Sequence, residues 1–237
     1  GKTFIATEAA RQLCTQHASL TYKGHASTLV ICPAHLVAQW YDFWTTQYPE
    51  DHVVSIEGQG QRKWAYFDLT GVDCIIVSVQ SLRRKDFLDK LTQMCIHNHT
   101  HVSIIDESHY IKNKDAKQSH NVRTITAPGF IPHCILLTAT PIVREADDLY
   151  HQLRVVDHIT FRSSDTFLNR YCWFSSGSYG PTNVSLRRDA HKHLEANKYH
   201  LTDNLVPSNT NNNNLGWIQG YSYADIGLEL PPIIPPT

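Results

Sequence analysis

The sequence predicts an α/β domain in which a parallel β-sheet has helices on both faces. Short apolar runs rich in β-branched residues recur along the first two thirds of the chain, and segments with helical spacing separate them. A strand buried in a parallel sheet is a nearly continuous apolar run, and strands that alternate with helices form βαβ units. Acidic or hydroxyl residues follow two of these runs. Parallel sheets bind ligands at the carboxyl ends of their strands, so these residues are candidates for a site.

Five segments are predicted as strands because each is short, apolar and bounded by turn residues. They are Thr28–Cys32, His52–Ile56, Cys74–Val79, His101–Asp106 and Cys134–Thr138. Together with the helices between them, they predict one domain over roughly residues 1–160.

Two helices are predicted from their apolar spacing. The first runs from Thr3 to about Gln16, with Ile5, Ala9 and Leu13 at four-residue steps. The second begins near Pro33, and its apolar stripe consists of Leu36, Val37, Trp40 and Trp44. Because both tryptophans lie on this stripe, we expect them to pack in the core rather than to stack on bases.

The pattern weakens in the last third of the chain. Ser163–Asp165 predicts a helix start before Thr166–Tyr171, and Leu186–Tyr199 has the spacing of a further helix with a basic face. The Asn-rich run 208–214 and the proline-rich run 231–236 do not favour regular structure. We therefore expect a partly irregular C-terminal extension. Since the chain starts at Gly1 rather than Met, we also expect it to be an internal piece of a longer protein.

The composition is that of an ordinary globular chain. The formal net charge of -1 shows no overall basic signature, so any nucleic-acid contact must be local. The 6 cysteines form no C-x-x-C pair and favour buried, reduced thiols. Neither a signal peptide nor a membrane-spanning run is recognisable, so no membrane association or secretion is expected. His97, His99 and His101 alternate without cysteine or carboxylate partners at ligand spacing, and no structural metal site is expected.

Gly1-Lys2-Thr3 opens the first predicted helix and matches the end of the phosphate-binding pattern G-x-x-x-x-G-K-[ST]. In such a loop, backbone N–H groups, the helix N-terminus and the lysine hold phosphates. The hydroxyl of Thr3 would then be a magnesium ligand. A tripeptide alone is a weak signal, and its value depends on the acidic pair Asp106-Glu107, which lies about a hundred residues further on.

Asp106-Glu107 ends the predicted strand His101–Asp106, and in isolation the pair could be a simple acidic turn. Together with the Gly1-Lys2-Thr3 segment it fits a phosphoryl-transfer site in which Asp106 holds Mg²⁺ and Glu107 polarises the attacking water. Lys2 would complete the catalytic set. A third element, Thr138-Ala139-Thr140, follows another strand, and its hydroxyls are expected to bond His109 and couple the nucleotide site to the rest of the domain. This order of motifs indicates an ATPase that uses ATP and Mg²⁺.

At these residues the chain resembles the SWI/SNF-type ATPases of helicase superfamily 2. Asp106–Asn113 (DESHYIKN) resembles the family's D-E-x-H box with its I-K-N tail, and Leu29–Trp40 (LVICPAHLVAQW) resembles its strand, C-P and L-x-x-x-W segment. Further similar segments are Cys74–Leu82, Asp148–Leu153, Phe161, Phe167–Tyr171, Leu186–Arg188 and Leu228–Pro232. One departure is Thr138–Pro141 (TATP), where the family usually has T-G-T-P; that form is closer to other superfamily 2 motors.

The resemblance implies a RecA-like P-loop domain, the first of two lobes that close on ATP. We expect this lobe over residues 1–172, a helical and Asn-rich insertion or linker over 173–227, and the start of a connection to a second lobe over 228–237. The implied partners are that second lobe and double-stranded DNA, with nucleosomes or other DNA-bound proteins as further candidates. The implied location is the nucleus for a eukaryotic protein and the cytoplasm for a bacterial or viral one.

By the same analogy, two loops would face the DNA backbone. The first contains Pro33, Ala34 and His35, and the second contains Ser78, Gln80 and Ser81. The neighbouring Arg83 and Arg84 are candidates for phosphate contacts, because Lys and Arg supply the sequence-independent part of DNA affinity. A solvated charged surface is the alternative for these arginines.

Three functions remain open at this point. The first is a double-stranded DNA translocase or chromatin remodeller whose ATP-binding lobe is this chain. The second is another superfamily 2 motor, such as a strand-separating helicase or a restriction-enzyme motor subunit. The third is a non-catalytic remnant that binds nucleotide or DNA. In the first two cases the isolated chain is expected to have negligible turnover, because the family's phosphate-stabilising arginines come from the second lobe.

Overall fold

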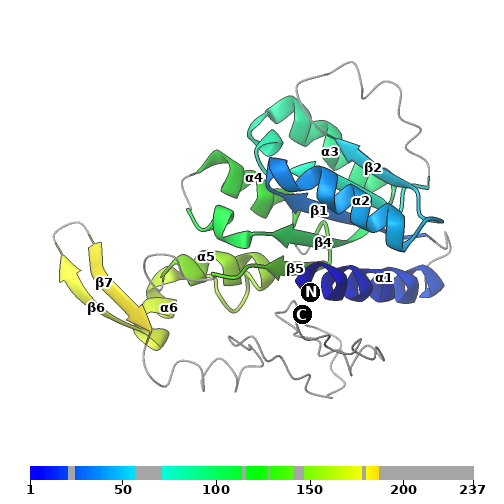
Figure 1. Ribbon diagram of the computed structural model, residues 1–237. Helices are drawn as coiled ribbons and strands as arrows, with labels where there is room; N and C mark the ends of the chain where they lie inside the picture. Colours follow the sequence, from blue (N-terminus) through cyan, green and yellow to red (C-terminus); the bar gives the residue numbers. More distant parts are fainter. Residues whose placement is uncertain are drawn as a thin grey trace, which may run out of the picture.

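The computed structural model describes residues 1–20, 25–56, 71–113, 116–127, 129–140, 147–177 and 180–186. Their main feature is a 5-stranded sheet in the order β2-β3-β1-β4-β5, in which all neighbours are parallel (Figure 1). The strands are β1 Ser27–Cys32, β2 Val53–Ile56, β3 Cys74–Ser78, β4 Thr100–Asp106 and β5 His133–Leu137. The five predicted strands and the parallel α/β fold class are confirmed. Each strand end lies within about one residue of its predicted position.

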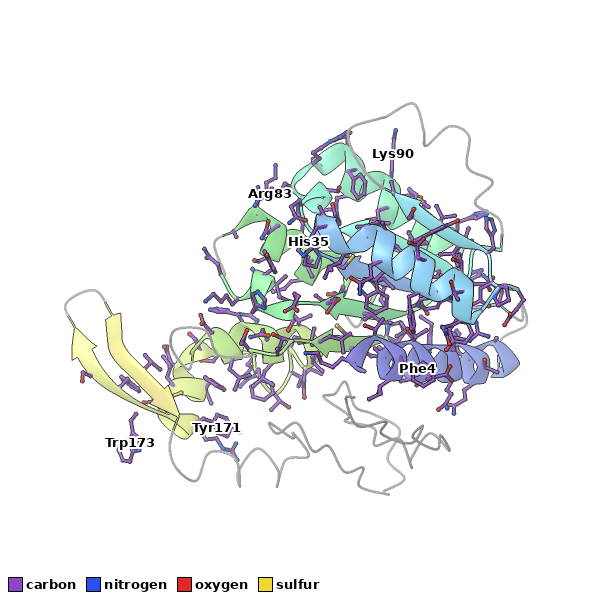
Figure 2. All side chains as sticks on the ribbon, in the orientation of Figure 1. Phe4, His35, Arg83, Lys90, Tyr171 and Trp173 are labelled. Atoms are coloured by element: carbon purple, nitrogen blue, oxygen red, sulfur yellow. The ribbon has the colours of Figure 1, made fainter. Side chains whose placement is uncertain are left out.

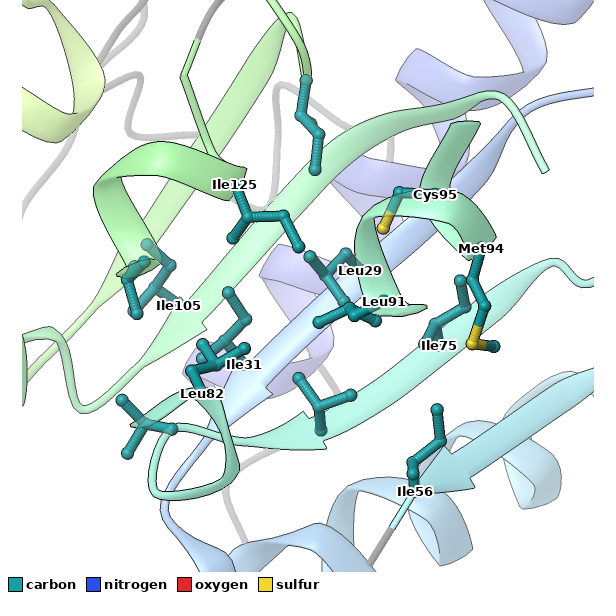
Figure 3. Packing of buried hydrophobic residues seen from close by; sticks show 14 of the residues in the cluster. Leu29, Ile31, Ile56, Ile75, Leu82, Leu91, Met94, Cys95, Ile105 and Ile125 are labelled. Atoms are coloured by element: carbon teal, nitrogen blue, oxygen red, sulfur yellow. The ribbon is translucent and has the colours of Figure 1, made fainter. Parts of the chain in front are cut away.

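Helices cover both faces of this sheet. Helices α1 (Lys2–Leu20) and α2 (Val37–Gln47) pack on side chains such as Val30, Ile76 and Ile104. Helices α3 (Lys85–His97) and α4 (Lys117–Ile125) pack on the alternate positions. Figure 3 shows this second layer, with Leu91 and Ile125 against Leu29, Ile31 and Ile75. The period-two alternation of a strand thus divides the apolar residues between two helical layers, which explains why these strands are apolar throughout.

The helix predicted near Pro33 begins as a short 3-10 turn, η1 (Ala34–Leu36), before α2. Trp40 and Trp44 are buried, as predicted. Helix α1 extends to Leu20, about four residues beyond its predicted end. Two further 3-10 turns, η3 (Ser81–Arg83) and η4 (Ser108–Ile111), follow the carboxyl ends of β3 and β4.

A separate, smaller cluster of buried side chains lies after the sheet in the chain. Helices α5 (Asp147–Val156) and α6 (Ser164–Tyr171) enclose an aromatic cluster that includes Tyr150, Phe161 and Phe167. The predicted start of α6 is confirmed, because the Ser163 side chain accepts a hydrogen bond from the Thr166 N–H.

Strands β6 (Cys172–Gly177) and β7 (Gly180–Leu186) form an antiparallel hairpin that projects away from the sheet in Figure 1. This hairpin was not predicted. The helix predicted to start at Leu186 is wrong at that residue, because Leu186 pairs with Cys172 in the hairpin. The remainder of that helix, the Asn-rich run and the proline-rich run lie outside the described residues.

The 6 cysteines all lie in the described residues and are buried, as the sequence predicted, and none of them forms a disulfide. Burial raises the pKa of the Cys14 thiol to about 11 and that of Cys134 to about 12, which disfavours the reactive thiolate. Over the described ranges, none of the helices is both long and apolar enough to cross a bilayer.

Candidate functional site

Helix α1 places Gly1, Lys2 and Thr3 at the carboxyl edge of the sheet. The Cys14 Sγ lies 3.5 Å from the Ser27 carbonyl oxygen at the start of β1, and the His17 ring stacks on His101 at the start of β4. The helix therefore runs antiparallel to the strands. Lys2 precedes Cys14 by about 18 Å of helix, whereas β1 needs only about 13 Å from Thr28 to its end. The N-terminus of α1 thus reaches the edge where Asp106 lies.

Asp106 is the last residue of β4, and both of its carboxylate oxygens accept hydrogen bonds. The Glu107 N–H donates to Oδ1 at 2.9 Å, and the indole N–H of Trp40 donates to Oδ2 at 2.8 Å. Strand β4 lies beside β1, where the strand order reverses, and such a switch point is the usual ligand position in an open parallel sheet. The carboxylate is thus held in one orientation, and each oxygen keeps a second lone pair for a ligand.

The Trp40 contact is a feature of the candidate site that the sequence analysis missed. Trp40 was predicted only as a core residue, and its side chain is indeed buried. A buried indole, however, usually finds an acceptor for its N–H, and this requirement was the available signal. Its acceptor is 66 positions further along the chain, so the partner itself could not be inferred from local spacing.

Glu107 begins a sharp turn out of the sheet. Its backbone is left-handed, with φ 49° and ψ 53°, a conformation that costs a residue with a Cβ roughly 1–3 kcal/mol. Its Oε2 lies 3.1 Å from Nδ1 of His109. The same ring nitrogen lies 3.4 Å from the Thr138 hydroxyl, so the contact predicted between His109 and the two hydroxyls is confirmed for Thr138. Thr140 contributes its backbone N–H, which donates to Thr138 Oγ1 at 3.1 Å.

The turn that contains Glu107 is anchored on α5. The Ser108 hydroxyl donates to Oε1 of Gln152 at 2.6 Å, and both side chains are buried. Lys112 of the I-K-N tail forms an ion pair with Asp148 at 2.9 Å. These contacts give the tail a structural role, because they hold the loop after β4 against α5.

The residues predicted to face DNA gather beyond the carboxyl ends of β1 and β3. The Ala34 N–H donates to Oε1 of Gln80 at 3.1 Å, which joins the two loops. His35 and Arg83 are labelled on this side of the molecule in Figure 2. His35, Gln80 and Arg83 are exposed, whereas Pro33 and Ser78 are buried and shape the loops instead. The Arg84 guanidinium pairs with Asp86 at 2.6 Å.

Three histidines meet at the opposite edge of the sheet. The His101 ring lies 3.6 Å from that of His17 and 4.8 Å from that of His133, measured between centroids. Burial and the two neighbouring rings lower the pKa of His101 to about 4. In the part of the chain that the structure describes, no group of three or more His, Cys, Asp or Glu side chains is arranged to hold a metal ion.

A polar hollow of about 200 Å³ also lies at this opposite edge. Its lining includes Arg11, Cys14, Asp51 and Asp73. Arg11 is already paired with Asp51 and Glu50. Since Gly1-Lys2-Thr3 and the Asp106 and Glu107 carboxylates are at the other edge, the carboxyl edge is the stronger candidate site.

The chain is similar to several known proteins. A family model described as SNF2-related domain matches residues 1–195. A Caenorhabditis elegans homolog of SWI/SNF-related matrix-associated actin-dependent regulator of chromatin subfamily A-like protein 1 is 26% identical over 158 residues, which are 67% of this chain and 22% of that protein. Chromodomain-helicase-DNA-binding protein 9 of Mus musculus is 31% identical over 68 residues, or 29% of this chain and 2% of that protein.

Among solved structures, the Sulfolobus solfataricus SWI2/SNF2 ATPase core in complex with dsDNA matches with a TM-score of 0.49 and 22% identity. The match covers 61% of this chain and 28% of that one. The chain thus spans about a fifth of the length of the C. elegans relative and a still smaller share of the chromodomain protein.

Proposed function

Because the chain belongs to the SNF2-related domain family, we propose that it is the ATP-binding lobe of a DNA-dependent ATPase that moves along double-stranded DNA. The observation that supports this proposal is the meeting of three segments at one edge of the sheet. The start of α1, the Asp106-Glu107 pair and the Thr138–Thr140 segment all lie there. The proposed lobe spans residues 1–172, followed by an insertion or linker at 173–227 and a connection to a second lobe at 228–237.

The donors at this edge fit a magnesium nucleotide. Mg²⁺ prefers oxygen ligands, and the proposed ligands are the Thr3 hydroxyl and the Asp106 carboxylate. When bound, Mg²⁺ would neutralise phosphate charge. Gly1 and Lys2 would hold the phosphates with the free N–H groups of the α1 N-terminus. Trp40 and the Glu107 N–H keep Asp106 in place.

Glu107 is proposed to orient and polarise the attacking water, as a carboxylate next to the metal can. His109 contacts both Glu107 and Thr138. A shift of the segment after β5 would therefore move His109 and change its contact with the Glu107 carboxylate. This contact supports the proposed coupling role of His109, Thr138 and Thr140. The transition-state arginine would come from the second lobe, and 1–237 alone is therefore expected to turn over ATP negligibly.

The proposed DNA contacts are the loops at Pro33, His35, Ser78 and Gln80, with Arg83 and Arg84 beside them. Exposed side chains of this region would touch backbone phosphates, which give affinity without sequence specificity. The C. elegans relative is named a regulator of chromatin, and by that analogy nucleosomes or other DNA-bound proteins are proposed partners. The nucleus is then the proposed location if the protein is eukaryotic.

One sequence feature favours a second candidate, a strand-separating helicase or restriction-type motor. Thr138-Ala139-Thr140 lacks the glycine that SWI/SNF-type proteins usually have between the threonines. The two candidates are separated by measuring displacement of a triplex-forming strand beside separation of duplex strands. Triplex displacement without strand separation supports the translocase.

The direct test is ATP hydrolysis by the full-length protein with and without linear double-stranded DNA. Lys2→Ala and Glu107→Gln should abolish hydrolysis, and Glu107→Gln should still bind ATP because the phosphate-binding groups are intact. Glu50→Gln is the matched control, since Glu50 pairs with Arg11 at the opposite edge. Normal hydrolysis by Glu107→Gln would show that Glu107 does not activate the water.

A further inference from the structure

Gln118, at the start of α4, joins the DNA-facing loop to the loop that contains Glu107. Its Oε1 accepts a hydrogen bond from Nε of Arg83 at 2.8 Å. Its Nε2 donates to the backbone carbonyl of Tyr110 in η4 at 3.3 Å. One buried amide thus bonds the residue that ends η3 and a residue of the turn after β4.

The connection continues to the catalytic candidate. The Tyr110 N–H donates to the Glu107 carbonyl at 2.9 Å, which closes the first turn of η4. A displacement of Tyr110 would therefore act on the backbone of Glu107. Asn121, one helical turn after Gln118, donates to the Leu82 carbonyl at 2.5 Å and holds η3 against the same helix. Helix α4 is thus bonded to both loops by polar side chains.

Arg83 is arranged to take a phosphate while it remains attached to Gln118. The side chain is exposed, and within the described residues its terminal guanidinium nitrogens make no hydrogen bond. Fixing Nε leaves the two terminal N–H groups directed as a fork, the arrangement that binds phosphate oxygens in pairs. By contrast, the Arg84 guanidinium is held by Asp86 in the first turn of α3, the helix that Arg84 precedes.

We propose that Gln118 is a positioning residue that transmits phosphate binding at Arg83 to the Glu107 turn and so supports DNA stimulation of ATP hydrolysis. This inference rests on the proposed function. A phosphate that draws Arg83 outward pulls on Gln118 Oε1, and the Gln118 Nε2 contact passes the shift to Tyr110. Both ends of the amide are needed, because one binds each loop.

The test uses the full-length protein and the ratio of its ATPase rates with saturating linear duplex DNA and without DNA. Gln118→Met keeps the length of the side chain but loses both hydrogen bonds. Coupling between two sites typically changes an equilibrium by about 5- to 150-fold, so we expect this variant to lower the ratio at least about fivefold. Saturating DNA separates this effect from weaker DNA binding.

Gln118→Glu separates the two contacts. A carboxylate keeps the acceptor for Arg83 but cannot donate to the Tyr110 carbonyl. Its negative charge beside Arg83 should weaken DNA binding, so the comparison is made at saturating DNA, where the variant should still lose stimulation. Lys90→Ala is the control, because Lys90 is an exposed cation on α3, away from η3 and η4, and its removal should leave the ratio unchanged.

The outcomes distinguish this inference from the function on which it rests. If duplex DNA fails to stimulate the wild-type protein, the proposed function is wrong and the inference falls with it. If DNA stimulates the wild type and both Gln118 variants by the same factor, Gln118 does not transmit DNA binding. The same conclusion follows if Gln118→Met lowers both rates in proportion, because a merely structural role would do so.

Discussion

Replacing Trp40 by Phe removes the indole donor to Asp106 and keeps an aromatic ring in the core. The lost hydrogen bond is 2.8 Å long and ends on a carboxylate oxygen, and such bonds contribute about 1.5–3 kcal/mol to stability. The smaller ring adds the cost of a cavity. Partners that orient a metal ligand typically change metal affinity about 10- to 100-fold. We therefore expect the Mg²⁺ concentration that half-saturates ATP hydrolysis to rise about tenfold or more.

The chain contains a matched control on the same helix. Trp44 is also buried in α2, and its indole N–H donates to Oδ2 of Asp51 at 2.8 Å. Asp51 precedes β2 and therefore lies at the edge opposite Asp106. Trp44→Phe has the same change of ring and loses a bond of the same kind. It should lose stability to a similar extent and leave the Mg²⁺ requirement unchanged.

Two measurements on the full-length protein test whether Trp40 orients Asp106 or only stabilises the fold. Urea unfolding gives the free energy of unfolding of each variant, and a Mg²⁺ titration of DNA-stimulated ATPase gives the half-saturating concentration. If Trp40→Phe and Trp44→Phe shift the Mg²⁺ requirement equally, the effect is one of general stability. The proposed orientation of Asp106 by Trp40 would then be refuted.

Two further predictions concern stability. Burial, together with the neighbouring His17 and His133 rings, lowers the pKa of His101 to about 4. Between pH 6.5 and 4 the unfolded chain therefore binds more protons at His101 than the folded chain does. The free energy of unfolding should therefore fall as the pH falls through this window, and His101→Gln should flatten the slope; an equal or steeper slope in urea unfolding of the variant would contradict this. Ser108→Ala removes a buried donor to Gln152 and should lower the free energy of unfolding by about 1–3 kcal/mol, measured in the same way, and an unchanged value would show that this bond does not anchor the turn.

The sheet and the position of the candidate site were predictable because they depend on local patterns. Continuous apolar runs define parallel strands, and polar residues directly after such runs must lie at the carboxyl edge. Asp106 and Thr138 satisfied both conditions, and register then places the last residue of β4 beside Leu137 of β5. These positions could be predicted without knowing any contact between residues far apart in the sequence.

The contacts that orient the site were not predictable because their partners are distant in sequence. Trp40 and Asp106 are 66 positions apart, and Arg83 and Gln118 are 35 apart. Local patterns suggest another role for three of them: Trp40 as a core aromatic, Arg83 as a solvated arginine and Gln118 as an ordinary helix residue. The β6–β7 hairpin was missed for a similar reason, since Leu186 fits a helical stripe and its pairing with Cys172 is set only by the fold.

The left-handed backbone of Glu107 shows how these distant contacts determine the site. A residue with a Cβ adopts this conformation only where the surroundings stabilise it, at a cost of roughly 1–3 kcal/mol. The turn is bonded on one side to α5 through Ser108 and on the other to α4 through Tyr110. Released from these helices, the turn would relax to an ordinary backbone and redirect the carboxylate. The orientation of the Glu107 carboxylate therefore depends on α4 and α5, and a displacement of either helix would change it.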